Sequence, residues 1–115
     1  MSGDDPAGRV FAALADATRR EIVRRLAADG PLTATRLAGV LPISRQAVSK
    51  HLAALELADL VVAERAGREA RFELRTAAFA EAEAWMRVIG ATWTLRLDAL
   101  RASVERPDLH VAGKG

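Results

Sequence analysis

The stretch that most constrains the fold is SRQAVSKHLAALELADL, at residues 44–60. It opens with the hydroxyl of Ser44, a residue type favoured at helix N-caps. Its apolar residues Val48, Leu52 and Leu55 recur at intervals of four and three, which predicts a helix with one buried face. The first two turns are mostly polar and basic, with Arg45, Gln46, Ser49 and Lys50. The pattern therefore predicts a helix that holds a polar edge outward above a hydrophobic core.

Local signals predict two short helices near the start of the chain. Asp5 followed by Pro6 is typical of an N-cap with proline at the first helical position. Thr18 and Glu21 have the spacing of a capping box, which predicts that Thr18 begins the second helix. The Asp-Gly-Pro run at residues 29–31 is expected to end that helix.

A third helix is expected directly before residue 44. Thr33 is placed to cap it, and Pro42 is placed to end it. Its apolar positions follow the spacing i, i+3, i+4, i+7 and are Ala34, Leu37, Ala38 and Leu41. This helix is expected to brace the following one through Leu37 and Leu41.

The pattern changes after Asp59. The stretch LVVAERAGREARFEL predicts two strands around a turn at residues 66–69. Thr76 is expected to cap a last helix that runs to about Val104. The predicted fold class is therefore mainly α with a small β-hairpin, in the order α-α-α-α-β-β-α.

Two short helices joined by a tight turn and followed by a hairpin form a winged helix-turn-helix. In such a unit the second helix can enter the major groove of DNA with its N-terminal side chains toward the bases. The net charge is only +2, but the segment from Arg36 to His51 has three Lys or Arg residues and no acid. The predicted DNA-binding residues are Arg36, Ser44, Arg45, Gln46, Ser49 and Lys50 on the helices and Arg65, Arg68 and Arg71 on the hairpin. The helix alone leaves open an ordinary amphipathic helix with a solvated polar face.

Four segments carry a resemblance to a known family: ALADATRREIV, LTATRLA, SRQAVSKHLAAL and ADLVVAERAGREARFEL. Over about residues 9–104 the chain resembles the ArsR/SmtB family of bacterial winged-helix repressors. The resemblance implies a homodimer that represses its own operon at a pseudo-palindromic operator. Asp59 is a departure, because the family usually has glycine there.

Many members of that family release DNA when a metal ion binds. The resemblance places the family's thiolate site at Thr33 and Thr35, and neither residue can replace a thiolate. The chain has no cysteine, and its two histidines are His51 and His110. His51 is interpreted as a partly buried, hydrogen-bonded side chain. We therefore expect no metal site and no cofactor.

The last predicted helix carries a long apolar stripe. A single small domain cannot bury such a band, so pairing with a second copy is expected. The predicted dimer-interface residues are Phe11, Met86, Ile89, Trp93, Leu97 and Leu100. An alternative is that Trp85 and Trp93 line a pocket for an organic effector.

The predicted organisation is one domain at residues 1–106 with a flexible tail at residues 107–115. The start of the chain is acidic and unlike a signal peptide, and no apolar run approaches membrane-spanning length, so a cytoplasmic protein is expected. No residue pattern of an enzyme is found. The predicted function is a DNA-binding repressor, and a winged-helix module that binds another protein stays open as an alternative.

Overall fold

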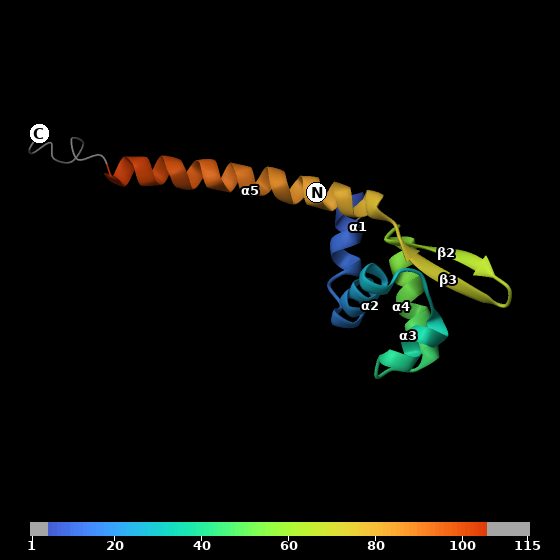
Figure 1. The fold of residues 1–115 in the computed structure, drawn as a ribbon. Helices are drawn as coiled ribbons and strands as arrows, with labels where there is room; N and C mark the ends of the chain where they lie inside the picture. Colours follow the sequence, from blue (N-terminus) through green and yellow to red (C-terminus); the bar gives the residue numbers. More distant parts are fainter. Residues whose placement is uncertain (1–4, 106–115) are drawn as a thin grey trace, which may run out of the picture. The chain divides into compact units, whose positions relative to one another are not determined.

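The structure is a computed structural model that describes residues 5–105. The elements, shown in Figure 1, are α1 (Pro6–Ala13), α2 (Ala17–Asp29), β1 (Leu32–Thr33), α3 (Ala34–Val40), α4 (Arg45–Leu57), β2 (Val61–Ala66), β3 (Glu69–Leu74) and α5 (Thr76–Glu105). The strands form one antiparallel sheet in the order β1-β3-β2. The predicted winged helix-turn-helix is confirmed, with one strand more than the sequence pattern indicated.

Side-chain caps begin three of the helices where the sequence predicted them. An Asp5 carboxylate oxygen accepts a hydrogen bond from the backbone N–H of Gly8 at 2.7 Å and begins α1. Thr33 Oγ1 accepts from the N–H of Arg36 at 3.1 Å and begins α3. Ser44 Oγ accepts from the N–H of Ala47 at 3.1 Å and begins α4. Each cap satisfies an N–H group that the helix leaves without an internal partner.

The prediction that Thr18 caps the second helix is wrong. Asp16 is the N-cap of α2, and its carboxylate accepts from the N–H of Arg19 at 3.0 Å. Aspartate is at least as good an N-cap as threonine, so the helix begins two residues earlier. Glu21 instead pairs with Arg24 and, at 3.1 Å, with Arg25.

The start of α5 also differs from the prediction by one residue. Thr76 is the first residue of the helix and not the capping residue before it. The predicted end near Val104 agrees with the observed end at Glu105.

The strand β1 was missed because it has only two residues and no alternating pattern of its own. It pairs with β3 through Leu32 opposite Phe72 and Thr33 opposite Arg71. A partner this distant in sequence leaves no local signal. The pairing joins the chain before α3 to the hairpin that follows α4.

The core of residues 5–82 lies between the helices and one face of the sheet. Val48, Leu52 and Leu55 on α4 are fully buried, as predicted. The other large, fully buried side chains of this core come from α1, α2, α3 and the segment after α4, and they are Val10, Ile22, Leu37, Leu60 and Val61. The apolar face of α4 is therefore packed against several other elements. This packing fixes the orientation of the helix and turns its polar side chains toward solvent.

The chain divides into two compact units, residues up to 82 and residues from 83. Helix α5 is buried in the first unit at Ala78 and Ala82 and continues through the second unit. The predicted single domain at residues 1–106 stays a prediction. The predicted tail at residues 107–115, including His110, lies outside the described residues. No helix among residues 5–105 is both long and apolar enough to cross a membrane.

Candidate nucleic-acid interface

The polar edge of α4 is exposed along its first two turns. Arg45, Gln46, Ser49 and Lys50 are all exposed, and Val48 between them is fully buried. This alternation follows from the helical period, which places residues 45, 46, 49 and 50 on one side and residues 48, 52 and 55 on the other. The edge thus presents a guanidinium, an amide, a hydroxyl and an ammonium group, which are donors that match base edges and phosphates.

Arg45 and the preceding N-cap residue Ser44 also make hydrogen bonds within the helix-turn-helix. Arg45 Nε donates a hydrogen bond to Thr35 Oγ1 at 3.0 Å, which ties the start of α4 to α3. The other guanidinium N–H groups of Arg45 remain able to donate outward. Ser44 Oγ accepts the capping hydrogen bond, and its O–H can still donate. The positioning role of Thr35 was missed, because it lies off the apolar stripe that the sequence reading followed.

The wing is formed by β2, the turn at Gly67 and Arg68, and β3. Gly67 has a φ of 69°, a left-handed conformation that suits glycine in a two-residue hairpin turn. Arg68 is exposed at the tip of this turn. The tip therefore presents a cation at the end of the hairpin, as the sequence predicted.

The strand register separates the other two arginines of the wing. Arg65 pairs with Ala70, and Arg71 pairs with Glu64. Opposite residues share a face and successive residues alternate, so Arg65 and Arg71 lie on opposite faces of the hairpin. Arg71 also has a carboxylate directly across from it. The structure does not bring all three wing arginines to one surface.

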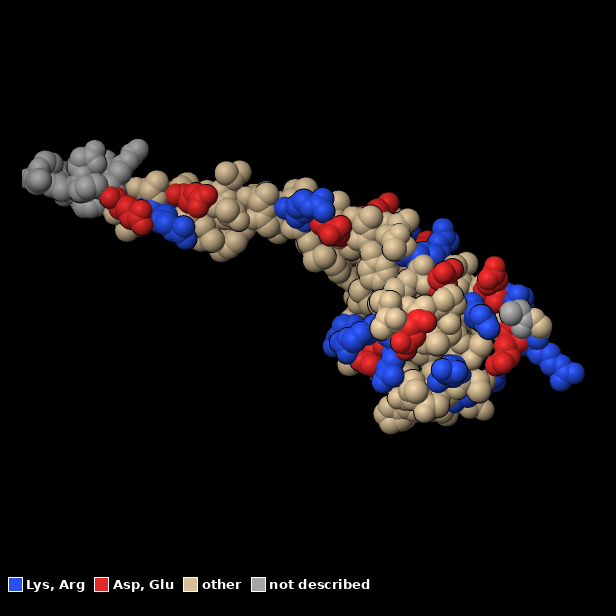
Figure 2. Space-filling view, in the orientation of Figure 1, with Lys and Arg blue, Asp and Glu red and all other residues tan. Residues whose placement is uncertain are grey.

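Basic and acidic side chains are mixed on the face of the molecule seen in Figure 2. Arg36 is exposed on α3 and lines a hollow of about 480 Å³ together with Glu69 of the wing. On α5 the exposed charges pair along the helix, Arg87 with Glu83 at 3.3 Å and Arg101 with Asp98 at 3.9 Å. The first two turns of α4 carry Arg45 and Lys50 without an acid, but basic residues are not confined to this edge, since α2 carries four arginines against two acids.

His51 faces inward from α4. It is half-buried, and its Nδ1 accepts a hydrogen bond from Arg19 Nε of α2 at 3.3 Å. The interpretation of His51 as a partly buried, hydrogen-bonded histidine is confirmed. The nearby Asp16 carboxylate has a pKa held below its ordinary value, chiefly by the hydrogen bond from the Arg19 backbone N–H and also by the positive charge of Arg19.

The positions that the resemblance assigned to a thiolate site have other roles here. Thr33 caps α3, and Thr35 accepts the hydrogen bond from Arg45. Within residues 5–105 there is no group of three or more His, Cys, Asp or Glu side chains placed to hold a metal ion.

The predicted dimer residues fall into two sets. Phe11 is half-buried and packs against the core of the first unit. The others lie on α5, where Trp93 and Leu100 are each 57% exposed and Leu97 is half-buried. The exposed apolar side chains of α5 are Trp85, Met86, Val88, Ile89, Trp93, Leu95, Leu100 and Val104. An apolar surface of this extent is typical of an interaction site.

Comparisons with known proteins agree with this architecture. A family model for a helix-turn-helix domain matches residues 14–64. The chain is 52% identical over 66 residues to the HTH-type transcriptional regulator Rv2034 of Mycobacterium tuberculosis, over 57% of this chain and 61% of that protein. The match therefore spans less than two thirds of that relative.

Solved structures extend the comparison over most of the chain. An ArsR-like transcriptional regulator from Rhodococcus sp. RHA1 is similar with a TM-score of 0.74 and 39% identity, over 88% of this chain and 93% of that one. The homodimeric winged helix-turn-helix DNA-binding domain of Mb0332 from Mycobacterium bovis is similar with a TM-score of 0.60 and 25% identity, over 79% and 91%. Taken with the exposed edge of α4 and the wing, these matches show that the chain belongs to the ArsR-like family of winged helix-turn-helix transcriptional regulators.

Proposed function

We propose that this chain binds double-stranded DNA as a homodimer at a pseudo-palindromic operator and represses transcription there, including from its own promoter. The observation that carries the proposal is the exposed polar edge of α4 above a fully buried underside at Val48, Leu52 and Leu55. Such a helix presents its N-terminal side chains at a fixed angle, which reading a major groove requires.

Within this edge, each side chain has a contact that its chemistry suits. Gln46 can make a bidentate contact with adenine, and Lys50 can donate to guanine. Ser44 and Ser49 can donate to phosphate oxygens. Arg45, held by Thr35, is pre-oriented for guanine or phosphate.

The wing supplies a second contact outside the major groove. Arg68 at the tip would meet phosphate or the minor groove. Because Arg65 and Arg71 lie on opposite faces of the hairpin, one of them at most contacts the same DNA surface as Arg68. We favour Arg65, since Glu64 lies directly across from Arg71.

Binding to a pseudo-palindromic operator needs two copies of the chain. The similar Mb0332 domain is homodimeric, and α5 carries an exposed apolar band that a second copy would bury. A two-fold dimer reads two half-sites about one helical turn apart. We assign the dimer interface to Met86, Ile89, Trp93, Leu97 and Leu100 of α5 and to Phe11 of α1.

The proposed repressor responds to no metal ion and performs no catalysis. The residues at the family's thiolate positions are threonines with structural roles, and the two remaining sulfur atoms of the chain belong to methionines. Metal sensors of this kind rely on thiolate or imidazole ligands.

The test is a fluorescence-anisotropy titration of the duplex upstream of the chain's own gene, at two salt concentrations. We expect tight binding with a steep salt dependence, because neutralised phosphates release counterions. Gln46→Ala should weaken binding by about 1–3 kcal/mol and relax the base preference at one position. Arg68→Ala should weaken binding to all duplexes and reduce the slope of the salt dependence.

Arg24→Ala is the matched control for Arg68→Ala, because it removes the same charge from an exposed side chain on α2 that is already paired with Glu21. Normal operator binding by the double variant Gln46→Ala, Lys50→Ala with intact helicity would refute the proposed interface. Absence of duplex binding by a folded wild-type dimer, with capture of a protein partner by the same face, would favour the protein-binding alternative.

A further inference from the structure

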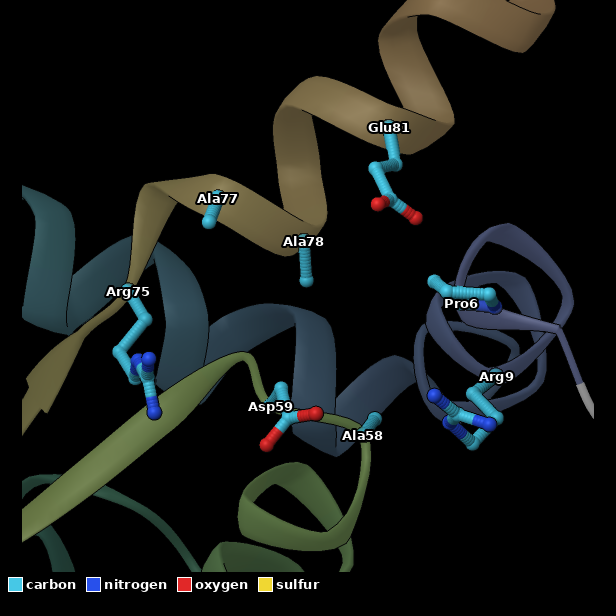
Figure 3. Close-up of a pocket in the computed structure, with 8 residues that line it drawn as sticks. All are labelled: Pro6, Arg9, Ala58, Asp59, Arg75, Ala77, Ala78 and Glu81. Carbon is cyan, nitrogen blue, oxygen red and sulfur yellow. The ribbon is translucent and has the colours of Figure 1, made fainter.

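A small cavity lies next to the C-terminal end of α4, within the compact unit that ends at residue 82. Its volume is about 220 Å³. It is bounded by the start of α1, the junction after α4 and the start of α5, as Figure 3 shows. The lining residues are Pro6, Arg9, Ala58, Asp59, Arg75, Ala77, Ala78 and Glu81.

The lining combines both signs of charge with small apolar walls. In Figure 3, Ala78 faces Asp59 across the cavity, with Arg75 to one side and Glu81 to the other. Among residues 5–105, none of Asp59, Arg75 and Glu81 takes part in an ion pair. The carboxylates of Asp59 and Glu81 and the guanidinium of Arg75 are thus available to a ligand, Arg9 adds a second guanidinium to the lining, and Ala58 and Ala78 are buried wall residues.

The backbone fixes the positions of the opposed charges. Asp59 has a φ of 60°, and its N–H donates to the Glu56 carbonyl at 3.0 Å. Arg75 is held by its own N–H, which donates to the Leu60 carbonyl at 2.8 Å. A left-handed conformation favours glycine over aspartate. Aspartate is one of the few other residues that adopt this conformation, and the exposed Asp59 carboxylate remains accessible at the edge of the cavity.

We propose that this cavity binds a small zwitterionic organic molecule of the size of a small amino acid. Its carboxylate would pair with Arg75, and its ammonium group would lie between Asp59 and Glu81. Charge-assisted hydrogen bonds of both signs match this lining. The volume is below the range of roughly 300–1,000 Å³ typical of pockets for drug-sized ligands, so the ligand is small.

The location connects the cavity to the parts of the molecule that would act on DNA. Asp59 follows the DNA-reading helix directly, and Arg75 joins the wing to α5. A ligand that bridges these two residues favours one arrangement of α4 and the wing over others. Its binding therefore changes DNA affinity, and DNA changes its affinity by the same factor. This coupling rests on the proposed function, whereas the binding site does not.

The test uses the full chain, labelled with nitrogen-15 and titrated at low salt with glycine, L-alanine and β-alanine. Propionate and ethylamine serve as ligands with one charge only. We expect saturable shifts at the amides of Ala58, Ala77 and Ala78 with one or more of the zwitterions, and weaker effects of the singly charged compounds.

Two isosteric or near-isosteric variants localise the effect. Asp59→Asn keeps a residue that tolerates positive φ, and Arg75→Gln keeps a polar side chain. Each should weaken zwitterion binding by about tenfold, since each removes one charged partner. Neither residue lies on the proposed DNA surface, so both variants should bind operator normally without ligand.

Four outcomes decide whether the cavity binds a zwitterion. Saturable shifts at the cavity that both variants weaken support the site. Equal binding of propionate with no effect of Asp59→Asn, shifts confined to other parts of the protein, or no saturation by any zwitterion would each overturn it. Because the titration contains no DNA, a failure to bind zwitterions can be distinguished from a failure of the chain to bind its operator.

Discussion

Leu97→Asp should separate the two protomers of the proposed dimer. Leu97 lies on α5 between Trp93 and Leu100, which are each 57% exposed in a single chain. If these side chains meet their two-fold mates, the substitution acts twice in every dimer. The change therefore tests whether the apolar band of α5 is the assembly surface.

The expected rise in the dimer dissociation constant follows from the burial of Leu97 at the proposed dimer interface. Losing a buried leucine side chain costs about 1.5–3 kcal/mol, so two copies cost about 3–6 kcal/mol for the dimer. A carboxylate without a partner in the interface adds a further desolvation cost. Since about 1.4 kcal/mol corresponds to a factor of ten, the dimer dissociation constant should rise at least about 100-fold.

Sedimentation equilibrium over a concentration series measures this constant directly. Ala91→Asp is the matched control, because it adds the same charge to α5 on the side of the helix away from Trp93, Leu97 and Leu100 and should leave the dimer intact. Operator affinity should fall together with dimerisation, since two half-sites require both protomers. The reasoning is refuted if Leu97→Asp keeps its helicity and still dimerises within tenfold of the wild type.

Three further predictions concern the core, a cap and metal response. Leu52→Ala should lower the free energy of unfolding by about 2–5 kcal/mol in urea titrations, because Leu52 is fully buried beneath the reading edge; a loss below about 1 kcal/mol would contradict that burial. Asp16→Asn should remove part of the acid sensitivity of stability. The pKa of Asp16 is lowered in the folded state, so its contribution is present at neutral pH and is lost as the pH falls through that lowered pKa; identical profiles of melting temperature against pH for variant and wild type would count against it. Zinc, cadmium and arsenite at a modest excess over dimer should leave operator affinity unchanged, and a stoichiometric loss that a chelator or thiol reverses would show a metal site that the donor set does not suggest.

Local sequence determined the starts of α1, α3 and α4 and the buried face of the reading helix. The caps at Asp5, Thr33 and Ser44 act on a backbone N–H three residues away, so the sequence holds both partners within one turn. The period of Val48 and Leu52 likewise needs no knowledge of the partner surface. For the same reason, the exposure of the polar edge of α4 could be predicted.

At the start of α2, two neighbouring capping signals compete, and the sequence analysis predicted the wrong one. Asp16 and Thr18 both offer a capping oxygen within one turn, and the better acceptor begins α2. The capping-box pattern pointed to Thr18, whereas the general preference for aspartate over threonine at N-caps favours Asp16.

Only the tertiary structure decided which distant residues meet. Leu32 pairs with Phe72, Arg19 reaches His51, and Arg45 reaches Thr35, each across segments that share no local pattern. The strand register alone separates the wing arginines onto two faces, because a shift of one residue would reverse them. These contacts form when packing of the core fixes the relative placement of helices and hairpin within residues 5–82, and no short window of sequence contains that information.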